Sequence, residues 1–170
     1  RNTKEDMIMK QDLYDKIVTY IVEHQNQFYR LAYSYVRSRE DALDVVQNGV
    51  CQALEHYKDL RNEDAVKTWF YRILVNESLR FLKDRNRLPL GEEELPEGVY
   101  EEKGFEMQDD LNQYISRLDG DTQTIIRLRF FEELSLKEIA DITEMNLNTV
   151  KAKLYRGLKQ LKVNVLEVDV

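Results

Sequence analysis

Helix-breaking residues are concentrated in one short segment of this chain. Residues 89–110 contain both prolines and three of the six glycines, while the long stretches on either side have few breakers. The same segment carries one basic and nine acidic residues, so its charge of −8 accounts for the net −7 of the whole chain. Breakers and repelling charges favour an extended linker over a packed element. We therefore expect two domains, at residues 10–88 and 111–166, joined by a flexible acidic linker at 89–110.

Both flanking segments show the apolar periodicity of amphipathic helices. The expected helices span about residues 13–21, 28–35, 40–57 and 64–85 in the first segment, and about 109–118, 122–131, 136–142 and 147–161 in the second. The predicted fold class is therefore all-α, with a four-helix bundle followed by a second helical bundle. Each domain is small, so each should have a modest core.

The expected helix at 40–57 has an apolar stripe and a polar face. The stripe consists of Leu43, Val46, Val50, Ala53 or Leu54, and Tyr57, which we expect to pack inward. The polar face carries Asp41, Asp44, Gln47, Asn48, Gln52 and Glu55.

The composition argues against several classes of protein. The single cysteine, Cys51, excludes an internal disulfide and a cysteine-cluster zinc site, and it fits a reducing compartment. His24 and His56 are isolated, and no glycine-rich phosphate loop occurs, so we expect neither an enzyme nor a metal or cofactor site. No apolar run approaches the roughly 20 residues of a membrane span, and no signal sequence opens the chain, which predicts a cytoplasmic protein.

The segment from Ser135 to Lys162 has the organisation of a helix-turn-helix. Ser135 and Glu138 have the spacing of a capping box, the turn "TEMN" follows, and Asn146 is a good N-cap for the last helix. Residues 146–162 hold five basic residues and no acidic one, and the basic residues lie opposite an apolar stripe. The second helix of such a motif enters the DNA major groove. The alternative is a solvated basic face on an ordinary bundle helix.

Glu144 lies in this turn, where many helix-turn-helix motifs place glycine in a left-handed conformation. A glutamate with that backbone costs on the order of 1 kcal/mol, unless the turn takes another shape.

A second basic helix begins at Lys67. It carries six basic and two acidic residues, together with the aromatic residues Trp69, Phe70, Tyr71 and Phe81. Aromatic rings beside cations suit single-stranded nucleic acid, because bases stack on the rings while the cations hold phosphates. The rings could instead form core, which we expect for Phe70 together with the aliphatic Ile73 and Leu74. For Trp69 both roles remain open, and Asn76 either caps a neighbouring loop or contacts a base.

Three linked stretches together resemble a known family. They are "YRLAYSYVRSREDALDVVQNGVCQALEHY", "KTWFYRILVNESLRFL" and "LRFFEELSLKEIADITEMNLNTVKAKLYRGLKQL". In this order they are similar to the signature stretches of extracytoplasmic-function (ECF) sigma factors, the short sigma-70-type subunits of bacterial RNA polymerase. Within that family the chain most resembles the sigma-V-type envelope-stress group of Gram-positive bacteria.

The resemblance implies a role for each domain. The first would be a sigma-2-like domain that docks on core RNA polymerase and opens the -10 element, and the second a sigma-4-like domain that binds the -35 element as duplex. The residues implied in polymerase docking are Asp41, Asp44, Gln47 and Asn48. Those implied in -10 binding are Arg61, Lys67, Trp69, Asn76, Arg80 and Lys83. Those implied in -35 binding are Asn148, Thr149, Lys151, Lys153 and Arg156.

Further partners follow from the resemblance alone. It implies control by a membrane-anchored anti-sigma factor and a role in envelope stress. The chain departs from the family at "QNGV": many members have an acidic residue in place of Asn48, and Gly49 costs about 1 kcal/mol of helix stability. The alternative function is a stand-alone helix-turn-helix regulator with an N-terminal helical sensory domain.

Overall fold

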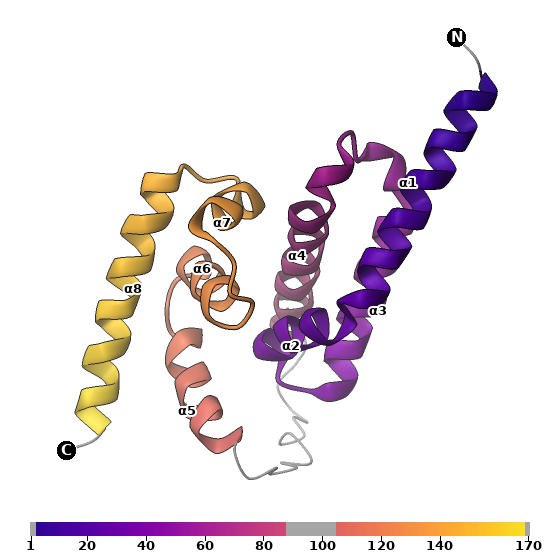
Figure 1. The fold of residues 1–170 in the computed structure, drawn as a ribbon. Coiled ribbons are helices and arrows are strands. Elements are labelled where there is room, and N and C mark those ends of the chain that lie inside the picture. The colour runs from indigo at the N-terminus through magenta and orange to yellow at the C-terminus, as the bar shows by residue number, and fades with distance from the viewer. Residues whose placement is uncertain (1–2, 88–104, 169–170) are drawn as a thin grey trace. The chain divides into compact units, whose positions relative to one another are not determined.

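The computed structural model describes residues 3–87 and 105–168, and the side chains of residues 3–86 and 111–162. The chain divides into two compact units, residues 1–85 and 86–170, and every regular element in the described ranges is helical (Figure 1). The N-terminal domain contains α1 (Thr3–Glu23), α2 (Gln25–Val36), α3 (Arg39–Glu55), the short 3-10 helices η1 (Tyr57–Asp59) and η2 (Glu63–Ala65), and α4 (Val66–Arg87). The C-terminal domain contains α5 (Phe105–Ser116), α6 (Gly120–Phe130), α7 (Leu136–Thr143) and α8 (Leu147–Val168).

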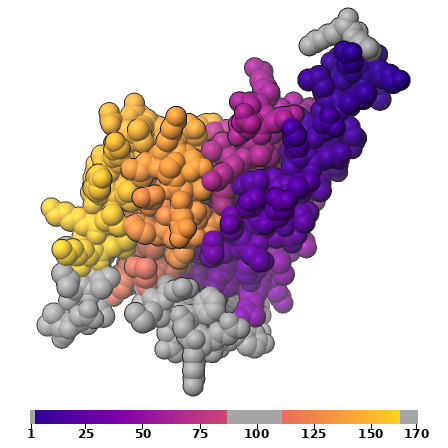
Figure 2. All heavy atoms as spheres, in the orientation of Figure 1, coloured from indigo at the N-terminus to yellow at the C-terminus, as the bar shows by residue number. Residues whose placement is uncertain are grey.

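The predicted all-α fold with two helical domains is confirmed, but two helices begin earlier than expected. Helix α5 begins at Phe105, so the C-terminal end of the expected linker is helical. Acidic residues favour a helix N-terminus, and Glu106, Asp109 and Asp110 lie in the first turns of α5. The rest of the expected linker lies outside the described residues. Helix α1 begins at Thr3, and its first turns extend beyond the rest of the N-terminal domain (Figures 1 and 2).

The core of the N-terminal domain is centred on aromatic contacts between α2 and α4. The ring of Phe28 lies 4.6 Å from that of Phe70 and 5.4 Å from that of Tyr71, and all three side chains are buried. Leu74 is also fully buried, whereas Ile73 is half-buried. The predicted core role is therefore confirmed for Phe70 and Leu74, and the rings of Phe70 and Tyr71 are not available to stack on nucleic-acid bases.

The predicted inward stripe of α3 was wrong for most of its residues. The buried residues of this helix are Ala42, Val45, Gly49 and Ala53. Leu43 is 51% exposed, and Val46, Val50, Leu54 and Tyr57 are half-buried. Small residues face inward because α3 packs closely: a Cβ added at Gly49 would lie 3.4 Å from Leu74 Cδ1 of α4. The large apolar residues therefore lie on a side of α3 next to the buried one, which is why they did not predict the buried side correctly.

The C-terminal domain contains the predicted helix-turn-helix. Both halves of the capping box are present, since the Ser135 hydroxyl accepts from the Glu138 N–H and the Glu138 carboxylate accepts from the Ser135 N–H. Glu144 adopts the left-handed conformation with φ 57° and ψ 34°, so the turn keeps its usual shape despite the missing glycine. Asn146 caps the N-terminus of α8 as predicted, since its side-chain oxygen accepts from the Asn148 N–H at 2.8 Å.

No helix in the described ranges is long and apolar enough to span a membrane.

Candidate nucleic-acid interface

Helix α8 has one buried side and one cationic side, as the sequence predicted. Val150, Leu154 and Leu161 are buried in the core of the C-terminal domain. The opposite side carries the residues we call the α8 cationic face: Lys151, Lys153, Arg156 and Lys159. Asn148 and Thr149, at the start of the helix, are exposed as well. The five residues predicted to bind the -35 element thus lie along one helix, and Lys153 is the one among them that is half-buried.

Gly157 sets how closely α8 approaches α6, a role that the sequence did not reveal. A Cβ added at Gly157 would lie 2.5 Å from Thr122 Cγ2 and 2.9 Å from Ile126 Cδ1. Glycine lacks that atom, so the first turn of α6 lies against the middle of α8. This contact brings the acidic residues that begin α6 next to the α8 cationic face.

Asp119 and Asp121 are the acidic residues concerned. Asp119 is the N-cap of α6, and its carboxylate accepts from the Thr122 N–H at 2.9 Å and from the Thr122 hydroxyl at 3.0 Å. The backbone hydrogen bond from Thr122 lowers the pKa of Asp119 below its ordinary value, with smaller contributions from Lys153 and Arg156. Asp121 Oδ2 lies 3.8 Å from Lys153 Nζ.

The lowered pKa of Asp119 predicts acid sensitivity of the C-terminal domain. The cap stabilises the domain fully above the unfolded-state pKa of about 4, and this stability is lost as the pH falls through the lower folded-state value. In urea unfolding followed by circular dichroism, Asp119→Ala should lose about 1 kcal/mol at neutral pH. Asp119→Asn keeps a capping oxygen, so it should lose less stability at neutral pH than Asp119→Ala does. Its free energy of unfolding should also fall less below pH 4 than that of the unaltered chain. The same dependence of stability on pH in Asp119→Asn and in the unaltered chain would contradict the role of the Asp119 carboxylate as a cap.

The predicted -10 residues of α4 share one face, which we call the α4 outer face. Asn76, Arg80 and Lys83 are exposed, and Trp69 is half-buried, so that part of its ring remains accessible. The other two predicted residues lie outside this set: Arg61 is exposed between η1 and η2, and Lys67 is half-buried at the start of α4. Asn76 is exposed within the helix, and no hydrogen bond from it to a loop is seen in the described part of the chain.

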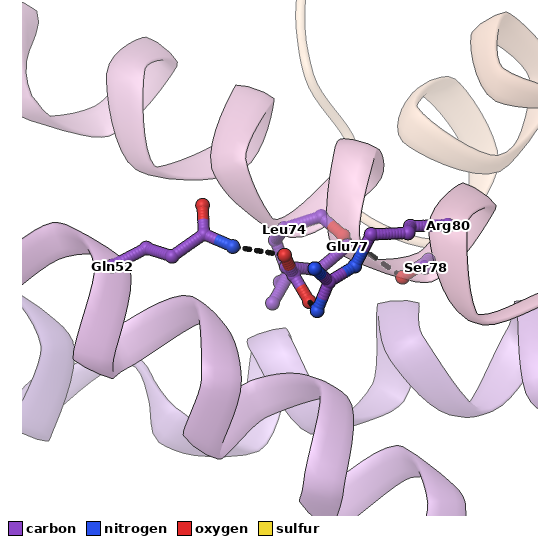
Figure 3. Close-up of polar contacts among 5 residues, drawn as sticks. All are labelled: Gln52, Leu74, Glu77, Ser78 and Arg80. Carbon is purple, nitrogen blue, oxygen red and sulfur yellow. Dashed lines mark hydrogen bonds and ion pairs between the residues drawn. The ribbon is translucent and has the colours of Figure 1, made fainter.

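A buried carboxylate lies beneath this face, and the sequence analysis missed it. Glu77 is 4% exposed, and it accepts hydrogen bonds from Gln52 Nε2 of α3 and, at 3.0 Å, from Arg80 Nη2 (Figure 3). Arg80 is therefore anchored at one end while much of its side chain faces solvent. The three-residue spacing of Glu77 and Arg80 could have suggested their pairing. The hydrogen bond from Gln52 to Glu77 could not be predicted from the sequence, because Gln52 lies on another helix.

The polar face of α3 is narrower than predicted. Asp41 Oδ2 lies 2.7 Å from Arg85 Nη2, and Gln52 donates to Glu77, so both side chains face α4. The exposed residues on the side of α3 away from α4, which we call the α3 outer face, are Glu40, Leu43, Asp44, Gln47, Asn48, Cys51 and Glu55. Three of the four predicted docking residues lie on it, and Asp41 lies at its edge with its carboxylate already paired.

Comparison with known proteins places both domains. Residues 20–88 match the family model for sigma-70 region 2, and residues 108–161 match that for sigma-70 region 4. The RNA polymerase sigma factor SigV of Bacillus subtilis is 41% identical over 164 residues, which cover 96% of this chain and 99% of that protein. The chain belongs to the ECF sigma factors of the sigma-70 family. An ECF RNA polymerase sigma-E factor of Haemophilus influenzae is 30% identical, covering 84% of this chain and 83% of that protein.

Two solved structures share the fold. CnrH, in complex with the cytosolic domain of CnrY, has a TM-score of 0.71 at 17% identity, covering 96% of this chain and 97% of that one. The sigma factor RpoE from Bartonella quintana, in complex with the anti-sigma factor NepR, has a TM-score of 0.67 at 19% identity, covering 89% of this chain and 97% of that one.

Family membership decides between the functions that the sequence left open. Sigma factors bind core RNA polymerase and promoter DNA, and they are transcription initiation factors rather than enzymes by themselves. In this ECF sigma factor the region 2 match runs from the end of α1 through α4, and the region 4 match runs from α5 into α8.

Proposed function

We propose that this sigma factor acts in the cytoplasm, where it divides promoter recognition and polymerase docking among three surfaces. The observation that carries the proposal is the one-sided α8, whose cationic face is exposed on a helix-turn-helix. In this arrangement Lys and Arg side chains attract phosphates, and residues near the helix start reach base edges in the major groove. Asn148 and Thr149 would contact bases of the -35 element, while Lys151, Lys153 and Arg156 would hold phosphates or bases.

The α4 outer face is proposed to hold the non-template strand of the -10 element. Trp69 offers a partly accessible ring for stacking, and Arg80 and Lys83 supply cations along the same face. Extruding a base from the duplex costs a few kcal/mol, which contacts from these residues and from Arg61 would offset. The ion pair with Glu77 holds part of the Arg80 guanidinium, which limits the conformational entropy that Arg80 loses on binding.

The α3 outer face is proposed to dock on core polymerase. It is polar, it includes the exposed Leu43, and it lies on a helix whose other side is fixed in the domain core. Docking sites of this kind combine an apolar contact with surrounding polar groups. Asp44, Gln47 and Asn48 would make the polar contacts.

Control by a membrane-anchored anti-sigma factor is proposed as well, in a response to envelope stress. Two of the structurally similar proteins were solved in complex with partners, CnrH with the cytosolic domain of CnrY and RpoE with the anti-sigma factor NepR. An anti-sigma factor that covered the α3 outer face would exclude polymerase by direct competition. Release of such a partner would then free the sigma factor for transcription.

A transcription assay tests the function as a whole. The protein is mixed with bacterial core RNA polymerase and a promoter library, and the start sites of the transcripts are sequenced. Discrete start sites that share spaced -35 and -10 elements are expected. No added initiation, with the same core polymerase active alongside another sigma factor, would contradict the proposal.

Arg156→Ala should separate -35 recognition from polymerase binding. Loss of a cation that contacts DNA should weaken promoter binding by the holoenzyme by about 1–3 kcal/mol, equivalent to roughly five- to 150-fold in Kd. Binding of the variant to core polymerase should stay unchanged. Lys159→Ala, which removes a charge one turn further from the helix start, is the matched control and should have a smaller effect. Loss of polymerase affinity in Arg156→Ala would refute the assignment.

A further inference from the structure

One residue of the α8 cationic face is already engaged by a carboxylate of the same domain. Lys153 Nζ lies 3.8 Å from Asp121 Oδ2, and the Lys153 side chain is only 26% exposed. Lys151, Arg156 and Lys159, on the same helix, are exposed. Lys153 therefore leans across toward α6 instead of extending into solvent with its neighbours.

The pairing follows from the backbone contact between the two helices. Gly157 allows α8 to approach the first turn of α6, where Asp119 and Asp121 lie. Asp119 is occupied by the cap of α6, since both of its carboxylate oxygens accept from Thr122. Asp121 makes no comparable contribution to the helix end, and its side chain is 67% exposed. Asp121 is therefore the carboxylate that pairs directly with Lys153, while Asp119, held by Thr122, attracts Lys153 and Arg156 electrostatically.

We propose that Asp121 competes with promoter phosphates for the Lys153 ammonium group and so limits the affinity of region 4 for the -35 element. The inference rests on the proposed role of α8 in binding duplex DNA. To contact a phosphate, Lys153 exchanges one anionic partner for another, so its gain on binding is reduced by the loss of the Asp121 interaction.

The size of this effect is bounded by solvent exposure. Pairs of this kind contribute about 0.2–1 kcal/mol, because water screens exposed charges. Removing the Asp121 charge should therefore tighten promoter binding by roughly 1.4- to fivefold at 0.1 M salt, by conversion of that range. The gain should shrink near 0.5 M salt, where the Debye length of about 4 Å is close to the 3.8 Å separation of the two charges.

A double-mutant cycle tests the pair in the intact holoenzyme. Core polymerase is combined with the unaltered sigma factor or with one of four variants: Asp121→Asn, Asp121→Glu, Lys153→Gln, and the double variant with both Asp121→Asn and Lys153→Gln. Their Kd values are measured on a promoter duplex chosen by start-site sequencing, at 0.1 and 0.5 M salt. Asp121→Asn should bind roughly 1.4- to fivefold tighter at 0.1 M salt, and Asp121→Glu should bind like the unaltered chain. In the Lys153→Gln background the Asn substitution should leave Kd unchanged, because the cation for which the carboxylate competes is gone.

The outcomes that would overturn the inference differ from failure of the proposed function. Unchanged or weaker binding by Asp121→Asn, with specific binding by the unaltered holoenzyme, would overturn the competition. An equal gain with and without Lys153 would also overturn it, because Asp121 would then act on the DNA directly. If the unaltered holoenzyme bound no promoter at all, the proposed function itself would fail, and the inference with it.

Discussion

Replacement of Gly157 by alanine should destabilise the C-terminal domain by about 1–2 kcal/mol, because an overlap this close should cost about 2–3 kcal/mol, the upper part of the overpacking range, and the better helix propensity of alanine returns about 1 kcal/mol. The added Cβ would meet Thr122 Cγ2 at 2.5 Å, which is closer than such atoms can approach. Thr122 cannot easily rotate away, because β-branched side chains are stiff and its hydroxyl donates to Asp119. The clash must therefore shift α6 against α8 or break the cap of α6.

The single tryptophan allows the stability of the N-terminal domain to be measured separately from that of the C-terminal domain. Trp69 lies in α4, so its fluorescence reports unfolding of the N-terminal domain, whereas far-UV circular dichroism reports both domains. In Gly157→Ala, the part of the dichroism change that comes from the C-terminal domain should occur at a urea concentration about 1–2 M lower, given a slope near 1 kcal/mol per M for a small domain. The Trp69 transition should stay in place.

Gly120→Ala is the matched control within the same domain. A Cβ at Gly120 meets no atom within 4 Å, so this substitution should be neutral or slightly stabilising. Superimposable dichroism curves for Gly157→Ala and the unaltered chain would show that the helix crossing tolerates a methyl group. An equal shift of the Trp69 transition would contradict the assignment of the effect to one domain.

The helix-turn-helix could be predicted closely because its signals are local. Ser135 and Glu138 cap a helix that begins beside them, and Asn146 caps the helix that it begins. Glu144 shows the limit of local rules, since it takes the left-handed backbone that they disfavour. About 1 kcal/mol of strain is small against the packing of two helices on either side of the turn.

The inward face of α3 could not be predicted because the contact is made by small residues. Ala42, Gly49 and Ala53 do not stand out in a search for large apolar side chains, yet they let α3 lie close to its neighbours. Gly49 was expected to weaken the helix. A Cβ at Gly49 would lie 3.4 Å from Leu74 Cδ1, which is an ordinary contact, so the site needs a small residue but not glycine; at Gly157 the 2.5 Å approach to Thr122 Cγ2 leaves no room for a Cβ.

The polar contacts beneath the candidate surfaces could not be predicted from the sequence either. Asp41 pairs with Arg85, which lies 44 positions away, and Gln52 donates to Glu77, 25 positions away. No periodicity within α3 distinguishes Asp41 and Gln52, which face α4, from Asp44 and Gln47, which face solvent. The packing of α3 against α4 makes that distinction, and it leaves Asp44 as an exposed acidic residue in the middle of the α3 outer face.

Asp44→Arg should lower the affinity for core polymerase at least tenfold, while promoter recognition by α8 and the fold remain intact. A reversed charge within a docking surface replaces an attraction with a repulsion, which costs several kcal/mol when the partner carries the complementary charge. The effect should be large here because Asp44 is the one exposed carboxylate among the four predicted docking residues. Asn48 is neutral where many family members carry an acidic residue, and Asp41 is paired with Arg85. Binding to labelled core polymerase, titrated at fixed salt, measures the loss.

Asp15→Arg provides the matched control for this charge reversal. Asp15 is exposed on α1 of the same domain, so the control carries the same change in net charge away from the α3 outer face. Equal losses in the two variants would mean that polymerase responds to overall charge, and an unchanged affinity of Asp44→Arg would count against the docking face. The Trp69 unfolding transition should be the same in both variants, because an exposed carboxylate contributes little to the fold. A loss of affinity confined to Asp44→Arg would therefore come from the docking contact, since Asp41 and Gln52 hold α3 on α4 in both chains.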